Sequence, residues 1–336
     1  MNAIEPMEAK NADALPDGIG WQYEPKWDGF RCLAFIADGD VRLVSKAGKP
    51  LGRYFPEVIA GLAGLPDCVL DGELIIPFGP TLSFEALQMR LHPAESRVRK
   101  LSVETPARLM LFDLLKLAGK ALATEPLAIR RKALERLYAE HRSGLLRLSP
   151  TTDSHDIAQR WLAGTGSALD GVIAKRSDEA YRPGERAMVK VKRMRTADCV
   201  VGGFRYATKK KEVATLLLGL FDKMGVLHHV GHCSGLSAVD KAELTHQLEG
   251  LVGRPGFTGD APGGPSRWAT RRTTDWQPLR SKLVVEVRFD HVTGGRFRHG
   301  TGFLRWRPDK QPEQCTMEQL GEEARPAIVD EAIVGA

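Results

Sequence analysis

Cysteine is scarce in this sequence of 336 residues, which contains only five. Their positions are Cys32, Cys68, Cys199, Cys233 and Cys315. An odd number of scattered cysteines argues against a disulfide framework, and none of the spacings is typical of a zinc site. The cysteine usage therefore predicts a protein of a reducing compartment.

Long apolar runs are also absent. No stretch approaches the roughly 20 apolar residues that a membrane-spanning helix requires. Met1 to Asp13 contain no apolar segment of the kind that precedes a signal-peptide cleavage site. We therefore expect a soluble cytoplasmic protein without a membrane partner.

The charge balance is basic, with 48 Lys and Arg against 42 Asp and Glu, a net charge of +6 and a pI near 9.1. Such a balance suits a polyanionic partner, although many basic proteins never bind nucleic acid.

The chain of 336 residues exceeds the size at which a single hydrophobic core usually stops growing. Two domains are therefore expected.

The first half of the sequence mixes short strand-like runs with helical patterns. Leu33–Ile36 and Val41–Val44 flank Asp38-Gly39, a dipeptide that tolerates the positive φ angles of a tight hairpin turn. Further strands are expected over Cys68–Ile76, Arg108–Leu115, Leu169–Ala174 and Met188–Lys192, and helices over Pro126–His141 and His155–Leu162. The elements interleave without the regular alternation of a parallel doubly wound sheet, which favours the α+β class.

The pattern changes after residue 195, where short apolar runs are separated by glycines. These runs are Cys199–Phe204, Thr215–Phe221, Val226–His232 and Lys282–Phe289. They predict a small all-β unit such as a five-stranded barrel. We expect the domain boundary near Arg195, which gives one domain of residues 1–195 and a second of residues 196–336.

Lys26 lies in the string Lys-Trp-Asp-Gly, which by itself is more often a solvated lysine beside a turn than a catalytic group. Further short strings follow it in a fixed order. They are Ser45-Lys46-Ala47-Gly48, Leu70-Asp71-Gly72-Glu73, Leu111-Phe112-Asp113, Asp170-Gly171-Val172-Ile173-Ala174-Lys175, Met188-Val189-Lys190-Val191-Lys192 and Arg305-Trp306-Arg307-Pro308-Asp309-Lys310. The set, rather than any one string, carries the information.

This order and spacing resemble the collinear motifs of covalent nucleotidyltransferases, the superfamily of ATP-dependent DNA ligases, RNA ligases and mRNA capping enzymes. The resemblance extends from Trp21 to about Thr316. Within the superfamily, the chain is most similar to bacterial DNA ligases of the ligase C type and to the ligase module of ligase D. The resemblance implies an adenylation domain with antiparallel sheets and helices, followed by an oligonucleotide-binding (OB) barrel.

The chemistry implied for Lys26 requires a free amine, because an ordinary lysine is almost wholly protonated at neutral pH. Nearby cations disfavour an ammonium group, so Lys175, Lys190 and Lys192 are expected to activate Lys26 while binding phosphate oxygens. Lys190 and Lys192 alternate along a predicted strand, which directs both side chains to one face. Without the other motifs, this face could equally be a solvated strand surface.

The resemblance implies further roles around the nucleotide. Phe112 corresponds to the aromatic residue that stacks on adenine, although out of context it would be a core phenylalanine. Glu24 corresponds to the acceptor for the adenine amino group, which favours ATP over GTP. Arg31 corresponds to an arginine that contacts the ribose or the nick end, and Glu73 to a residue that binds ribose.

The resemblance also implies a divalent cation, Mg²⁺ or Mn²⁺, which proteins bind through few carboxylate oxygens and several waters. Asp170 occupies the metal-binding position, and Glu73 is expected to assist. The family usually has glutamate where this chain has Asp170, so a contact bridged by water is an alternative to direct coordination. Asp71 is interpreted as a turn residue with Gly72, and Asp28 as support for the loop that presents Lys26.

Two regions are expected to bind phosphate groups, one the 5′-phosphate of the nick and the other the pyrophosphate leaving group. Lys46 stands where relatives often carry an arginine for the 5′-phosphate of the nick, and this difference keeps the charge but loses bidentate geometry. Arg307 and Lys310 lie in the last motif, which closes over ATP and orients the pyrophosphate leaving group. A hinge near Arg195 would allow the barrel to contact ATP in one step and DNA in another.

The sequence therefore predicts an ATP-dependent DNA ligase that seals nicks through a lysine–AMP intermediate. Its expected partners are nicked duplex DNA, ATP and, in DNA repair, a polymerase or an end-binding protein. An RNA ligase or a GTP-using capping enzyme is the alternative within the same chemistry. A catalytically silent nucleic-acid-binding protein is the alternative from another class, although binding alone does not require the lysine and carboxylate set.

Overall fold

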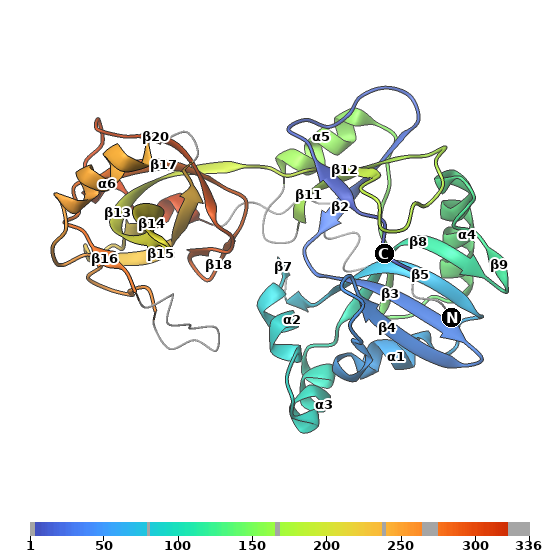
Figure 1. The fold of residues 1–336 in the computed structure, drawn as a ribbon. Helices are drawn as coiled ribbons and strands as arrows, with labels where there is room; N and C mark the ends of the chain where they lie inside the picture. Colours follow the sequence, from blue (N-terminus) through green and yellow to red (C-terminus); the bar gives the residue numbers. More distant parts are fainter. Residues whose placement is uncertain (1–3, 79–80, 165–168, 237–239, 264–274, 322–336) are drawn as a thin grey trace. The chain divides into compact units, whose positions relative to one another are not determined.

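The structure is a computed structural model that describes residues 4–78, 81–164, 169–236, 240–263 and 275–321. Its described residues form two compact units, one up to Arg193 and the other from Met194 to residue 321 (Figure 1). Within these ranges, no helix is both long enough and apolar enough to cross a lipid bilayer.

The first unit contains two large sheets. One has the order β1-β12-β11-β2, with β1 at Ala9–Asn11, β12 at Met188–Val191, β11 at Leu169–Arg176 and β2 at Trp21–Trp27. The other has the order β10-β8-β5-β3-β4, with β10 at Leu146–Leu148, β8 at Arg108–Leu117, β5 at Cys68–Ile75, β3 at Phe30–Ala37 and β4 at Asp40–Ser45. Most neighbouring strands are antiparallel, but β1 pairs with β12, and β10 with β8, in parallel.

Helices and short strands complete this unit. The helices are α1 (Pro56–Leu62), α2 (Phe84–Arg90), α3 (Glu95–Glu104), α4 (Leu127–Glu140) and α5 (His155–Ala163). The short strands are β6 (Pro77–Phe78), β7 (Thr81–Leu82) and β9 (Lys120–Ala121), and a 3₁₀ turn covers Gly52–Tyr54. The expected hairpin is present between β3 and β4, where Asp38 and Gly39 have φ angles of 52° and 81°.

Strand alternation separates the two faces of each sheet. On β3, Ala34 and Ile36 pack in one core with Val58 of α1 and Leu134 of α4. On the other sheet, Val172 packs with Ala158 and Trp161 of α5. These helices therefore cover the outer faces.

The opposite faces of the two sheets meet each other. Leu33 and Phe35 of β3 belong to a cluster with Met188 of β12, and Ile173 of β11 packs against it. Residues of alternate register along β2, β11 and β12 therefore point into the space between the sheets. This is the space in which a site can form.

The second unit is a closed barrel. Its strands are β13 (Arg195–Ala207), β14 (Lys210–Phe221), β15 (Leu227–Gly235), β17 (Val284–Phe289) and β20 (Thr301–Trp306). They run in the order β14-β15-β20-β17-β13, and pairing between β14 and β13 closes the circle (Figure 1). The same unit contains α6 (Lys241–Glu249), the short strands β16 (Gln277–Pro278), β18 (Val292–Thr293) and β19 (Arg296–Phe297), and 3₁₀ turns at Pro312–Gln314 and Met317–Leu320. The predicted fold class, an α+β unit followed by a small barrel, is confirmed.

The sequence analysis did not predict several elements, above all β2, which carries Lys26. Pro25 cannot donate to a strand ladder and therefore argues against a strand in the sequence. The structure accommodates Pro25 because β2 is an edge strand of its sheet. The helices α1–α3 and α6 and the strand β20 were also not predicted.

Gly29 connects β2 to β3 at a close approach of the backbone. A Cβ atom at this position would lie 2.1 Å from the carbonyl oxygen of Leu74 and 2.8 Å from Cγ of Glu73. Only glycine fits here without a shift of β5. The glycine that follows Lys26 in the sequence string is therefore required by packing against β5.

The substitution Gly29→Ala is expected to lower the free energy of unfolding by about 3 kcal/mol, because the new methyl group meets backbone that cannot move cheaply. Urea denaturation followed by circular dichroism measures the change. Gly64→Ala is the matched control, since a Cβ atom there meets nothing within 4 Å. Equal stabilities of the two variants would contradict the packing argument.

Candidate active site

A pocket lies between the facing sides of the two sheets of the first unit. Eight of the residues singled out in the sequence line it: Glu24, Lys26, Arg31, Lys46, Glu73, Phe112, Lys175 and Lys190. Glu24 and Lys26 alternate on β2, as do Ile173 and Lys175 on β11. Side chains from alternate positions on neighbouring strands therefore contribute to the pocket wall.

Lys26 is held by a carboxylate that a β-bulge directs toward it. Leu169 pairs with Trp27 and Gly171 with Lys26, so Asp170 is an extra residue without a partner in the register. Such a bulge redirects a side chain. Asp170 accepts a hydrogen bond from Lys26 and forms an ion pair with Lys192 at 3.1 Å.

Gly171 makes this bulge possible. Its φ angle is 146°, and a Cβ atom there would lie 2.1 Å from the carbonyl oxygen of Val191. Burial opposes ionisation of Asp170, but Lys26 and Lys192 hold its pKa below the usual value. Asp170 and Lys192 are joined to the pocket through Lys26 and are not among its lining residues.

A buried ion pair lies on the same wall. Lys175 donates a hydrogen bond of 2.8 Å to Glu24, and both side chains are less than 5% exposed. Gln22 donates to the other carboxylate oxygen at 2.8 Å. The ammonium of Lys175 also lies 4.7 Å from the ring centroid of Phe112. The carboxylate, the ammonium and the aromatic ring therefore form one connected group.

Arg31 belongs to a second network, which is centred on Asp71. The interpretation of Asp71 as a turn residue is wrong. Asp71 lies within β5, is fully buried, and accepts two hydrogen bonds of 2.6 Å from Arg31. Tyr181 donates to Asp71 at 2.7 Å and accepts from the backbone amide of Met7 at 2.8 Å. The Arg31 guanidinium lies 4.5 Å from the Phe112 ring centroid. Asp71 therefore fixes Arg31 beside the aromatic ring.

Glu73 faces the pocket on β5, directly opposite Arg31 of β3 in the strand register. Removal from water raises the pKa of Glu73 to about 7, although Lys26 and Arg31 act in the opposite direction. The carboxylates of Asp28 and Asp71 add to the increase. Glu73 is therefore poised to change its charge near neutral pH.

Lys46 lies at an exposed part of the pocket, where its side chain is 59% exposed. Lys46 forms an ion pair with Glu8 at 2.9 Å, and this pairing lowers the pKa of Glu8. The sequence analysis missed Glu8 and its neighbour Met7. They reach the pocket because β1 pairs with β12, nearly 180 residues later in the chain, and no local pattern marks that pairing.

Lys190 shows the effect of grouped cations. Burial lowers its pKa, and the positive charges of Lys26, Lys192 and Lys46 lower it further. Asp170 acts in the opposite direction. Lys190 and Lys192 therefore lie close to Lys26, with Asp170 as a partial counter-charge, whereas Lys175 is paired with Glu24.

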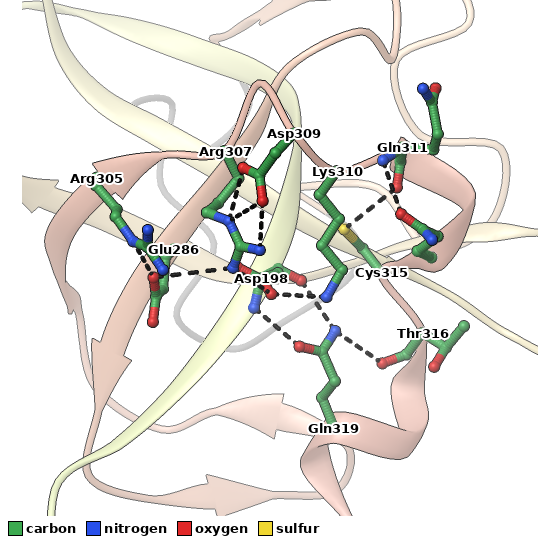
Figure 2. Close-up of polar contacts among 11 residues, drawn as sticks. Asp198, Glu286, Arg305, Arg307, Asp309, Lys310, Gln311, Cys315, Thr316 and Gln319 are labelled. Carbon is green, nitrogen blue, oxygen red and sulfur yellow. Dashed lines mark hydrogen bonds and ion pairs between the residues drawn. The ribbon is translucent and has the colours of Figure 1, made fainter.

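Arg307 and Lys310 belong to the second unit, in the turn after β20. Both bind Asp198 of β13, at 2.8 Å and 2.7 Å (Figure 2). Sequence analysis did not single out Asp198, because an aspartate on a strand near a domain boundary has no distinguishing local pattern. The three residues form a cluster on the barrel.

A divalent metal fits the first unit only together with a phosphate ligand. In the parts of the chain that the structure describes, no three His, Cys, Asp or Glu side chains are grouped so that they could hold a metal. Mg²⁺ is commonly bound by one or two carboxylates plus substrate phosphates. Glu73, where the charge of Lys26 opposes the rise in pKa that burial causes, and Asp170, which accepts a hydrogen bond from Lys26, match that smaller requirement.

Comparisons with known proteins show what the chain is similar to. Residues 6–192 match a family model described as an ATP dependent DNA ligase domain, and residues 209–310 match one described as an ATP dependent DNA ligase C terminal region. The chain is 43% identical over 332 residues to DNA ligase C1 of Mycolicibacterium smegmatis, covering 94% of this chain and 93% of that protein. It is 42% identical over 341 residues to DNA ligase C of Mycobacterium tuberculosis, covering 95% and 94%.

Among solved structures, the ligase domain of LigD from M. tuberculosis is 30% identical, with a TM-score of 0.50. The match covers 93% of this chain and 98% of that domain. A mycobacterial DNA ligase D complexed with ATP and MES is 31% identical, also with a TM-score of 0.50 and the same two coverages.

The raised pKa of Glu73 predicts a pH-dependent stability. The folded protein holds this proton up to about pH 7, whereas an unfolded chain releases it near the ordinary pKa of glutamate. The free energy of unfolding therefore falls as the pH rises from about 4.5 to above 7. Glu73→Gln is therefore expected to gain stability relative to the unsubstituted protein between pH 5 and pH 8, as urea denaturation would measure. Glu140→Gln, on the exposed face of α4, is the control, and an equal pH trend in both variants would refute the assignment.

Proposed function

Because the chain belongs to the ATP-dependent DNA ligase family, we propose that it seals nicks with 5′-phosphate and 3′-hydroxyl ends through a covalent AMP on Lys26. As a DNA ligase of this family, it uses ATP and acts on DNA. The observation that carries the proposal is the position of Lys26 on a pocket wall. There it is surrounded by the carboxylates, cations and aromatic ring that nucleotidyl transfer requires.

In the first reaction, the amine of Lys26 attacks the α-phosphate of ATP, and pyrophosphate leaves. The nucleophile is the uncharged amine. Lys190, which lines the pocket, and Lys192, which is paired with Asp170, bind the phosphate oxygens on which negative charge develops. Asp170 holds the side chain of Lys26 in place through the contact made by the bulge.

The base and ribose of ATP are assigned to the other side chains that line the same pocket. Phe112 offers its ring to adenine, while Glu24, oriented by Lys175, accepts a hydrogen bond from the adenine amino group. Arg31 and Glu73, which face each other across β3 and β5, bind the ribose. The buried Asp71 holds Arg31 in position for this contact.

Glu73 and Asp170 would hold Mg²⁺ or Mn²⁺ together with phosphate oxygens. When bound, the cation would neutralise charge on the transferring phosphoryl group. Lys46, with its exposed ammonium, binds the 5′-phosphate of the nick in the second reaction. Arg307 and Lys310 bind the pyrophosphate group in the first reaction.

We place the enzyme in DNA repair, together with a polymerase or an end-binding protein. The support comes from relatives: the chain is 32% identical to a multifunctional non-homologous end joining DNA repair protein, LigD of M. tuberculosis. The chain corresponds to 37% of that relative's length, so the remaining activities of LigD lie outside the matched part.

The direct test is the covalent intermediate. Incubation of the intact chain with labelled ATP and a divalent metal is expected to give a protein–AMP adduct that survives denaturing gel electrophoresis and is lost on heating in acid, because a phosphoramidate bond to Lys26 is covalent but labile to acid. Lys26→Ala should give no detectable adduct, whereas Lys49→Ala, an exposed lysine in the turn after β4, should label normally. Absence of an adduct from the intact chain would refute the proposed enzyme.

The metal assignment is tested at Asp170. Asp170→Asn is expected to raise the Mg²⁺ concentration needed for half-maximal adenylation by roughly tenfold, the scale of lost metal-site interactions. Asp170→Glu, which has the carboxylate usual in the family, should retain a midpoint close to that of the unsubstituted protein. Asp156→Asn, on the exposed face of α5, is the control. An unchanged midpoint in Asp170→Asn would remove Asp170 from the metal site.

A further inference from the structure

The guanidinium of Arg307 is almost fully engaged by carboxylates. Its Nη1 donates to both oxygens of Asp198, at 2.8 Å and 3.0 Å, and its Nε and Nη2 donate to Asp309, at 3.0 Å and 2.8 Å (Figure 2). All three guanidinium nitrogens therefore donate to a carboxylate. A phosphate that binds Arg307 competes with these carboxylates for the same nitrogens.

The two carboxylates differ in how firmly they are fixed. Asp309 lies in the same turn as Arg307, is 62% exposed, and can move together with it. Asp198 lies on β13, where Gln319 clamps its backbone: Asp198 donates to the Gln319 side chain at 2.9 Å and accepts from it at 3.0 Å. Movement of Arg307 therefore breaks the contact with Asp198 and can preserve the contact with Asp309.

Lys310 is tied to the same anchor. Its ammonium donates to Oδ2 of Asp198 at 2.7 Å, and Figure 2 shows Asp198 reached by Arg307 and Lys310 together. Both predicted pyrophosphate ligands thus share one carboxylate on the barrel. Asp198 therefore binds Arg307 and Lys310 at the same time.

The surrounding charges are balanced. Glu286 of β17, opposite Asp198 in the strand register, binds Arg305 at 2.6 Å and lies 3.9 Å from Arg307. The cluster therefore contains three basic side chains, Arg305, Arg307 and Lys310, and three acidic ones, Asp198, Glu286 and Asp309. An incoming anion meets no net positive charge until a carboxylate is displaced.

We propose that Asp198 is an internal competitor of pyrophosphate, which holds Arg307 and Lys310 on the barrel and releases them when a polyphosphate takes its place. The inference rests on the proposed function of Arg307 and Lys310. Asp198 is a positioning residue: it touches neither the nucleotide nor the reacting atoms, and acts through the two cations. Its presence weakens polyphosphate binding, and this weakening favours the departure of pyrophosphate after adenylation.

The first test measures binding without any reaction. Isothermal calorimetry with inorganic pyrophosphate compares the unsubstituted chain with Asp198→Asn. The variant is expected to bind about fivefold more tightly, the scale expected for release from a partly exposed ion pair. Adding Arg307→Gln to Asp198→Asn should abolish the gain, because the released cation is then missing. Structural damage to the barrel would not tighten binding.

The second test measures adenylation as a function of ATP concentration. Asp198→Asn is expected to lower the KM for ATP by a similar factor, while the single-turnover rate of AMP transfer, a step that precedes pyrophosphate departure, is not reduced. Asp198→Glu, which keeps the charge, should restore a KM close to that of the unsubstituted chain. Glu249→Gln is the matched control, since Glu249 binds Lys211 and Tyr206 on the same barrel and contacts neither Arg307 nor Lys310. Its KM should be unchanged.

The inference would be overturned if folded Asp198→Asn bound pyrophosphate no more tightly than the unsubstituted chain and its KM for ATP were no lower. If Asp198→Asn does not fold, as thermal unfolding would reveal, Asp198→Ser removes the same charge and is judged by the same two measurements. A chain that forms no AMP adduct would instead overturn the proposed function. The calorimetric comparison still decides the role of Asp198 in that case, because no bond is formed in it.

Discussion

The pairing of β2 with β11 fixes the position of Lys26, and the rest of the pocket depends on it. Lys26 lies opposite Gly171, and the extra residue Asp170 is directed to the lysine because the register shifts at that point. Alternation along the same strands places Glu24 and Lys175 on the pocket side. The hydrogen-bonded ladder thus brings together residues that are about 150 positions apart in the sequence.

Charge compensation is the second constraint. In the first unit Glu24 is paired with Lys175, Asp71 with Arg31, and Asp170 with both Lys26 and Lys192. Half-buried cations are stable only with such partners, since an uncompensated charge away from water is costly. In the second unit, Asp198 pairs with Arg307 and Lys310 in the same way. The phosphate contacts proposed for these cations would therefore exchange one anion for another.

Glycine positions show how sequence strings and packing are related. Gly29 and Gly171 each lie where a Cβ atom would be 2.1 Å from a carbonyl oxygen of a neighbouring strand. In the sequence, both glycines are recognisable only as parts of strings. Asp-Gly is a common turn dipeptide and predicts a turn at Asp71, yet Asp71 and Gly72 lie inside β5. Local propensity gave way there to a buried contact with Arg31.

The sequence by itself determined the fold class, the family and the residues that line much of the pocket, because strings of residue types in a fixed order and the period of apolar residues are local properties of the chain. The tertiary structure decided how those residues are paired. The ion-pair partners of Glu8 and Asp198 are known only from the pairing of β1 with β12 and from the closure of the barrel. The physical reason is that an ion pair depends on distance in space, and neither spacing nor composition specifies which distant strands will become neighbours.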